Sequence, residues 1–244
     1  MPIEYRDISL GALLAPDSKF LNRFKGVSSI MLATVFAAIK QNPKHSILIT
    51  GKAGVGKTTL VIALYRSALL RWTAECFNRN EFIPAVWKVT TRRLAIEQRE
   101  WANAETRPED GGPPTKLPTV TESKVLSAAR AKLNPCVFIE EFDKYKIDSS
   151  FQNTELHSIL DSAHNNNGRI IANSNWSMDR LRRSLPDNFG DAMIRRFIDP
   201  PHGMLIDFFK SEVYVNGTLV RWDPTTKVLV QTLPMRDGVF EKRS

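Results

Sequence analysis

The chain has 244 residues, of which 42% are hydrophobic and 25% are charged, and its formal net charge is +8. This apolar fraction excludes a mainly disordered chain, because it is enough to form a hydrophobic core. The positive charge favours a polyanionic partner, nucleic acid before membrane. Two cysteines and four scattered histidines favour neither a disulfide framework nor a zinc site. The chain has no signal-peptide core and no run apolar enough to span a bilayer, so we expect a cytoplasmic protein without a membrane partner.

Short apolar runs alternate along the chain with segments of helical spacing. We expect strands at 46–50, 84–90, 136–139 and 169–172, and helices at 27–40, 57–72, 91–104, 121–132, 151–166 and 177–197. The last helix is interrupted near Pro186, and the segment 105–118, rich in proline and glycine, is a surface loop. This alternation predicts an α/β fold in which a central parallel sheet lies between two layers of helices.

The tail of the chain has a different pattern. Residues 213–222 alternate between apolar and polar types about the pair Asn216-Gly217, which is typical of a β-hairpin, and 227–230 is a candidate third strand. We therefore divide the chain into an N-terminal extension (1–26), a core (27–205) and a small C-terminal β-hairpin appendage (206–244).

A phosphate-binding loop is predicted directly after the first strand. Residues 51–58 match the pattern GxxxxGK[ST] without a mismatch, between a predicted strand and a predicted helix. Its glycines let the backbone turn tightly, so that N–H groups converge on phosphate oxygens at the positive end of the helix dipole. We expect ATP here, with Lys57 on the β- and γ-phosphates and the Thr58 hydroxyl on Mg²⁺. The predicted nucleotide contacts are Gly51, Lys52, Ala53, Gly54, Val55, Gly56, Lys57, Thr58 and Thr59.

The strand at 136–139 is followed by carboxylates. Hydrolysis of ATP needs one carboxylate that holds Mg²⁺ and a second that polarises the attacking water. We assign Glu140 to the metal and Glu141 to the water. Glu140 departs from the usual aspartate, and Asp143 is the alternative metal ligand. The competing interpretation is a solvent-exposed acidic turn with no role in chemistry.

Two further polar features follow. Asn175 comes after the strand at 169–172, where it can orient the water between the γ-phosphate and Glu141; Asn173 is expected to lie within the strand. An Asx-turn that only closes the strand is the other interpretation. An arginine of the pair Arg195-Arg196, at the end of the last predicted helix, can reach the nucleotide of a neighbouring subunit and stabilise charge on the γ-phosphate. Here the alternative is a solvated basic helix end.

In this order, these segments resemble the motifs of the AAA+ ATPases, most closely the group that contains the helicase loader DnaC and the transposition ATPase IstB. The counterparts are Gly51–Thr58 for the Walker A loop, Ile139–Glu141 for Walker B, Ala172–Asn175 for the sensor 1 strand and Ala192–Phe197 for the arginine finger. Two further matching segments are 88–94, between Walker A and Walker B, and 155–160, between Walker B and the sensor 1 strand. The resemblance covers roughly residues 27–205. It implies an AAA+-like P-loop NTPase fold with Asn175 as sensor 1 and Arg196 as the arginine finger. In place of the family's helical lid, the β-rich tail predicts a lid that is missing or reduced.

The resemblance also implies a function. Such a protein hydrolyses ATP, forms a homo-oligomeric ring or spiral on DNA, and loads or recruits a helicase or a transposase. Arg92, Arg93 and Arg99 lie in the region that faces DNA in the resembled families, and a solvated helix face is the alternative. Two other function classes remain open: a translocating motor of the superfamily 3 helicase type, and a nucleotide-gated interaction or signalling module that does not bind DNA.

Overall fold

The computed structural model describes residues 8–15, 18–79, 86–90, 136–144, 158, 160–166, 168–184, 190–198 and 202–234. The predicted helices at 91–104 and 121–132 and the predicted loop at 105–118 lie outside these residues, as do the candidate DNA contacts Arg92, Arg93 and Arg99.

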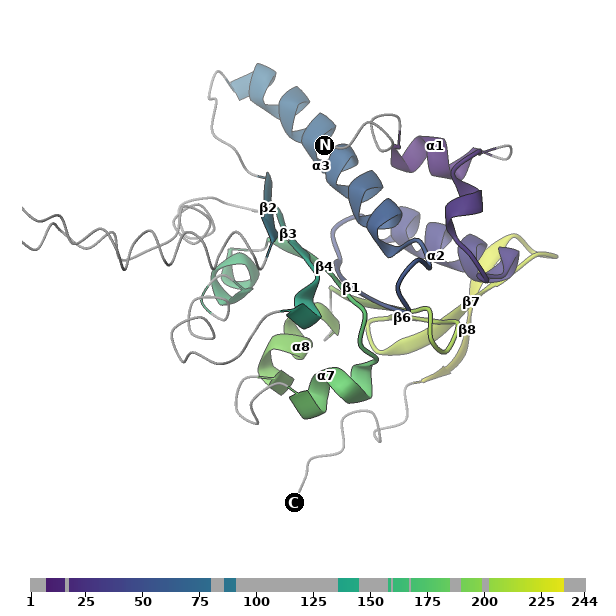
Figure 1. Cartoon of the computed structure of the whole chain (residues 1–244). Helices are drawn as coiled ribbons and strands as arrows, with labels where there is room; N and C mark the ends of the chain where they lie inside the picture. The colour runs from purple at the N-terminus through teal and green to yellow at the C-terminus, as the bar shows by residue number, and fades with distance from the viewer. Residues whose placement is uncertain are drawn as a thin grey trace, which may run out of the picture.

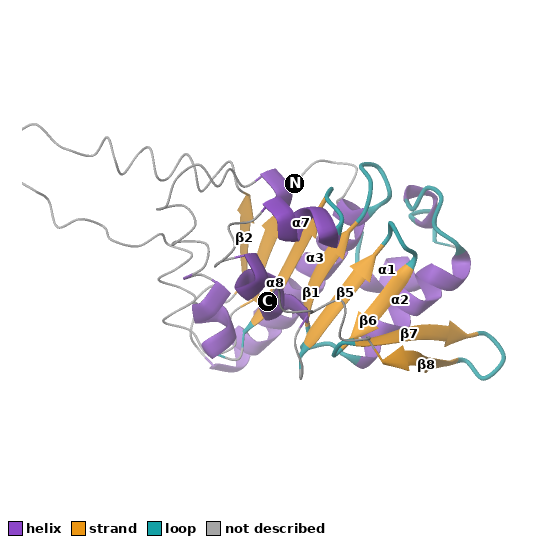
Figure 2. Ribbon diagram, turned by 90° about the horizontal axis from the view of Figure 1, so that it is seen from below, coloured by secondary structure: helices purple, strands orange, loops and turns teal. Residues whose placement is uncertain are grey.

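One sheet forms the centre of the described part of the chain, with eight strands in the order β2-β3-β4-β1-β5-β6-β7-β8 (Figure 2). The strands are β1 (Ser46–Thr50), β2 (Val86–Thr90), β3 (Cys136–Glu140), β4 (Arg169–Ser174), β5 (Gly203–Asp207), β6 (Glu212–Val215), β7 (Thr218–Asp223) and β8 (Val228–Pro234). The strands from β2 to β5 are parallel to one another, and β6, β7 and β8 are antiparallel to their neighbours. The predicted parallel sheet is therefore confirmed, and β5 is an additional strand that was not predicted.

Helices cover both faces of the sheet, as Figure 1 shows. One layer contains α1 (Leu10–Leu14), α2 (Ser29–Gln41) and α3 (Lys57–Arg79), and the other contains α7 (Met178–Ser184) and α8 (Gly190–Ile198). Two short 3-10 turns, η2 (Leu21–Arg23) and η3 (Phe142–Lys144), are also present, and residues 160–165 of the predicted helix at 151–166 are helical. The predicted helix at 177–197 is thus present as two helices on either side of 185–189. This three-layer arrangement is the predicted α/β sandwich.

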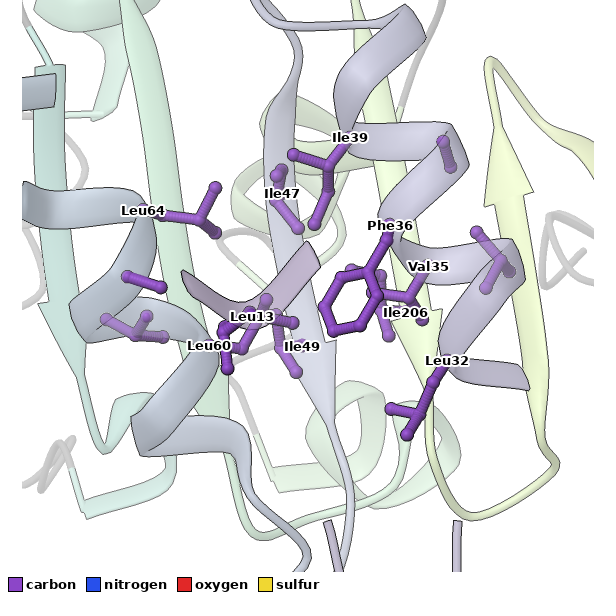
Figure 3. Close-up of a cluster of buried hydrophobic side chains, with 14 of the residues drawn as sticks. Leu13, Leu32, Val35, Phe36, Ile39, Ile47, Ile49, Leu60, Leu64 and Ile206 are labelled. Atoms are coloured by element: carbon purple, nitrogen blue, oxygen red, sulfur yellow. The ribbon is translucent and has the colours of Figure 1, made fainter. Parts of the chain in front are cut away.

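Two hydrophobic clusters hold the layers together, one on each face of the sheet. All five residues of β1 are buried, and alternate side chains point to opposite faces: Leu48 packs with α7 and α8, whereas Ile47 and Ile49 pack with α2 and α3. Figure 3 shows the second cluster, where Val35, Phe36 and other side chains of α2 meet β1 and β5. A strand buried on both faces explains why the sequence of β1 is a continuous apolar run.

The tail of the chain continues this sheet. The predicted boundary between 205 and 206 falls inside β5, which pairs with β1 on one side and β6 on the other. The hairpin at Asn216-Gly217 is present, with positive φ angles of 52° and 76° at the two residues. The Trp222 backbone N–H in β7 donates to the buried Thr34 hydroxyl of α2 at 3.0 Å. The helical layer of the core therefore also covers part of the tail, while the division of the chain into domains stays a prediction.

In the part of the chain that the structure describes, none of the helices combines the length and the apolar character that a membrane crossing requires.

Candidate functional site

The loop 51–56 connects the end of β1 to the start of α3. Gly51 is buried, while residues 52–54 are exposed. Gly56 has a φ of 99°, and a Cβ atom there would lie 2.6 Å from Phe24 Cδ1 and 3.0 Å from the Arg23 carbonyl oxygen. Only glycine fits this position, because the backbone conformation and the close approach both exclude a side chain. The loop is therefore packed against residues 23–24 of the N-terminal segment.

The first turn of α3 carries the residues predicted to contact phosphate and metal. Thr58 is exposed and Thr59 is buried, so the Thr58 hydroxyl is accessible to a ligand at the positive end of the helix dipole. Lys57, the first residue of the helix, is 6% exposed, and its Nζ donates to the Gly51 carbonyl at 2.7 Å and to the Lys52 carbonyl at 2.8 Å. Burial lowers the pKa of the Lys57 ammonium, and the negative charge of Asp143 opposes this shift.

The carboxyl ends of parallel strands meet at one edge of the sheet, and the arrowheads of β1 and β5 in Figure 2 point to that edge. Thr50, which precedes the loop, pairs with Ser174 at the end of β4. Asn175 follows directly, and its Oδ1 accepts a hydrogen bond from Lys57 Nζ at 2.9 Å. The structure thus places the predicted sensor asparagine against the predicted phosphate-binding lysine, which are 118 residues apart in sequence.

The predicted acids lie at the same edge. Glu140 is the last residue of β3, and its side chain lies outside the described part of the structure. Glu141 is exposed, has a positive φ of 56°, and donates its backbone N–H to Asn173 Oδ1 at 2.7 Å. A non-glycine residue in this left-handed region costs about 1–3 kcal/mol unless its surroundings stabilise it, and such residues are concentrated at functional sites. Asn173 is 3% exposed, so the buried amide fixes the backbone of Glu141.

Asp143 contacts Asn175 through both of its oxygens. Its Oδ1 accepts a hydrogen bond from the Asn175 backbone N–H at 2.7 Å, and its Oδ2 accepts a hydrogen bond from Asn175 Nδ2 at 3.3 Å. The sequence pattern suggested Asp143 only as an alternative metal ligand. The side chains of Asp143, Asn175 and Lys57 instead form a hydrogen-bonded row from η3 through the tip of β4 to the start of α3.

Arg196, the predicted arginine finger, is located on α8 and forms an ion pair within its own chain. Its guanidinium contacts Asp161, and its Nε donates to Asp161 Oδ1 at 2.6 Å. The two side chains are 26% and 30% exposed. The neighbouring Arg195 is exposed. A partner for Arg196 inside the chain was not expected, because Asp161 is 35 residues away and carries no motif.

Three residues near the loop were missed by the sequence-based prediction. Phe208 follows β5, donates its N–H to the Thr50 carbonyl at 2.9 Å, and lies so close to Gly51 that a Cβ there would be 2.8 Å from Phe208 Cβ. Phe24 lies 6.4 Å from Phe208 between ring centroids, which gives the loop an aromatic flank. Asp207 is buried at the end of β5, and burial raises its pKa while the N–H groups of Phe209 and Lys210 oppose the shift. The apolar run 204–206 was the signal for this strand.

These features fit a nucleotide with a bound divalent cation. A glycine-rich loop at a helix N-terminus, a buried lysine ammonium and an exposed threonine hydroxyl are the donors that bind phosphate, and the hydroxyl with neighbouring carboxylates supplies the hard oxygen ligands that Mg²⁺ prefers. Lys57, Thr58, Glu141 and Asn175 are brought to the same edge of the sheet, whereas the described contacts of Arg196 are made elsewhere, with Asp161.

No protein-family model matches the chain, and no curated protein matches its sequence. Among solved structures, the fold is similar to that of the DnaC helicase loader, with a TM-score of 0.49 and 16% identity over 84% of this chain and 99% of that chain. It is also similar to DnaA from Aquifex aeolicus bound to AMPPCP, with a TM-score of 0.48 and 15% identity over 80% of this chain and 50% of that chain. The similarity to DnaI has a TM-score of 0.42 and 19% identity, over 80% of this chain and 87% of that chain. These similarities concern the fold alone, and with TM-scores below 0.5 and identities below 20% they extend neither to a family nor to a function.

Proposed function

We propose that this chain binds ATP with Mg²⁺ and hydrolyses it. The observation that carries the proposal is the contact between Lys57 of the phosphate-binding loop and Asn175 at the tip of β4. It joins the element that binds phosphate to the edge where Glu141 is located. Each of these side chains has a known use in phosphoryl transfer, and Glu141 and Asn175 follow strands that end at the same edge of the sheet as the loop.

Each residue has a defined role in this proposal. The backbone N–H groups of 51–59 and the α3 dipole bind the phosphates, and Lys57 neutralises the β- and γ-phosphate charge. Thr58 and Glu140 hold Mg²⁺, which when bound supplies Lewis-acid stabilisation of charge on the phosphate oxygens. Glu141 accepts a proton from the attacking water, and Asn175 orients that water.

The first experiment separates binding from hydrolysis. Lys57→Ala is expected to abolish binding of a fluorescent ATP analogue, while Glu141→Gln keeps binding and stops phosphate release. Lys40→Ala is the matched control, because Lys40 is exposed in the last turn of α2, away from the loop. Normal phosphate release by Glu141→Gln would exclude Glu141 as the residue that activates the water.

We also propose that the subunits form a ring or spiral in which an arginine acts on the nucleotide of the neighbouring subunit. Arg196 is the proposed finger, and it would have to exchange Asp161 for phosphate. Arg196→Ala should hydrolyse poorly and regain activity when mixed with Glu141→Gln, whose intact arginine serves the neighbour's site. Failure of this mixture to recover activity, when both variants assemble, would contradict a shared site.

The proposed setting is DNA. The ordered motifs resemble a helicase-loader or transposition ATPase, and the net charge of +8 suits a polyanion. We expect ATP hydrolysis that is stimulated by DNA without strand separation, and weaker DNA retention at higher salt. Replacement of Arg92, Arg93 and Arg99 by alanine is expected to reduce that retention. Hydrolysis indifferent to DNA, without salt-sensitive retention, would indicate the nucleotide-gated module instead.

One structural feature favours a second candidate, the superfamily 3 type motor. After α8 the described residues 202–234 form strands β5 to β8 and no helix. A reduced lid is also typical of motors of the superfamily 3 helicase type. ATP-dependent unwinding of a forked duplex by the purified protein would select the motor over the loader.

A further inference from the structure

The contact between Asp143 and Asn175 has a directional consequence. A carboxylate only accepts hydrogen bonds, so the atom of the Asn175 side chain that faces Asp143 Oδ2 must be the amide NH₂. The amide oxygen then points the opposite way, where it accepts from Lys57 Nζ at 2.9 Å. A flipped amide would place its oxygen against the carboxylate and its NH₂ against the ammonium. Both hydrogen bonds would become repulsive contacts.

A second bond fixes the main chain of the same residue. The Asn175 backbone N–H donates to Asp143 Oδ1 at 2.7 Å, directly after β4 ends. Backbone and side chain are therefore held by one carboxylate, which is located on η3, two residues after Glu141. The element that carries the proposed water-activating acid thus also orients the proposed sensor.

Lys57 completes the row. An ammonium has three hydrogens, and Lys57 Nζ has three acceptors: the Gly51 and Lys52 carbonyls and Asn175 Oδ1. A phosphate oxygen bound by Lys57 must share or replace one of them. Asn175 therefore competes with phosphate for Lys57 Nζ. Once phosphate has replaced Asn175 on the lysine, the position of the Asn175 side chain decides which part of the ligand its amide faces.

We propose that Asp143 is a positioning residue that holds the Asn175 amide with its oxygen toward Lys57, and so sets the sensor for the hydrolytic step. This inference rests on the proposed ATP hydrolysis and deepens it. It gives Asp143 a role different from that of a Mg²⁺ ligand. Asp143 acts through Asn175 and does not touch the reacting atoms.

The test compares steady-state hydrolysis by Asp143→Ala, Asn175→Ala and the double variant. Loss of orientation is expected to lower kcat about tenfold or more while KM for ATP changes less than about threefold. In the Asn175→Ala background, the same Asp143 change is expected to have little further effect on kcat, because the side-chain amide that Asp143 orients is gone and only the backbone contact remains. Asp179→Ala on α7, an exposed aspartate, is the matched control and should keep wild-type kcat.

Three kinetic results would overturn the proposal. An unchanged kcat in Asp143→Ala would show that the orientation is not needed. An equal loss in the presence and absence of Asn175 would show that Asp143 acts independently. A large rise in the Mg²⁺ concentration for half-maximal rate would identify Asp143 as a metal ligand. If Asp143→Ala does not fold, Asp143→Asn keeps the volume but turns its NH₂ toward one of the two Asn175 donors, the side-chain amide or the backbone N–H, and a loss of kcat is again expected.

A readout that needs no hydrolysis separates this inference from the proposed function. The Asn175 backbone amide is expected to exchange with solvent about tenfold or more faster in Asp143→Ala than in the wild type, and at the wild-type rate in Asp179→Ala, as measured by NMR. A wild type without ATPase activity would remove the proposed function and the hydrolytic role of Asn175, while the exchange rate would still test whether Asp143 holds Asn175 in place. An unchanged exchange rate in Asp143→Ala would show that the contact does not hold Asn175, and would overturn the inference.

Discussion

The packing of the phosphate-binding loop against the N-terminal segment makes Gly56→Ala a sharp perturbation. Gly56 has a φ of 99°, and an alanine Cβ would lie 2.6 Å from Phe24 Cδ1 and 3.0 Å from the Arg23 carbonyl oxygen. Gly54 is the matched control in the same loop. It has a φ of 81°, and nothing lies within 4 Å of the position that an alanine methyl would occupy, so alanine there meets only the backbone cost.

The expected magnitudes follow from these two sites. A non-glycine residue at such a φ costs about 1–3 kcal/mol, which applies to both variants. The clash at Gly56 adds about 1–3 kcal/mol, because Phe24 is buried against Phe36 and Phe208 and a carbonyl group cannot rotate away. The gain from a less flexible unfolded chain is the same for both and cancels in the comparison.

The assay is thermal and urea unfolding of the two variants beside the wild type. For a chain of this size, each kcal/mol lowers Tm by about 2–4 °C, so Gly56→Ala should melt clearly below Gly54→Ala. In a Phe24→Ala background the difference between the two should shrink, because the nearest clashing atoms are removed. Equal Tm values for Gly56→Ala and Gly54→Ala would refute the packing of Phe24 on the loop.

Three other outcomes are expected. Burial lowers the pKa of His45 below 6.5, so as the pH falls the unfolded chain binds the proton before the folded chain does. The free energy of unfolding should therefore fall as the pH drops from about 7.5 to about 5.5. In urea unfolding, His45→Gln should show a weaker dependence of this free energy on pH, and an identical dependence would contradict the shift. Thr34→Val removes the acceptor of the Trp222 N–H and should cost about 1–3 kcal/mol in the same assay, whereas no loss would argue against the packing of α2 on the tail. Asp161→Ala should cost no more than about 1 kcal/mol, because its pair with Arg196 is partly exposed; a much larger loss would indicate a structural role for the pair.

The sequence alone determined those parts of this protein whose conformation depends on residues that are neighbours in the chain. The loop 51–58 was predicted because its glycines, lysine and threonine are contiguous, and the strand before it is a single apolar run. The Asn216-Gly217 turn was predicted for the same reason, since two residues that tolerate positive φ fix a hairpin within a few residues. β5 was missed because its apolar run is short and lies where the predicted core was taken to end.

Only the tertiary structure decided which distant groups meet. Strand order places the end of β4 beside the end of β1, and that brings Asn175 to Lys57 and to Asp143. It also makes the tail an extension of the central sheet and gives Arg196 the partner Asp161. The physical reason is that a hydrogen bond between side chains far apart in sequence leaves no periodicity or spacing in the chain. Such contacts depend on the packing of whole elements, whereas a loop or a turn depends on its own residues.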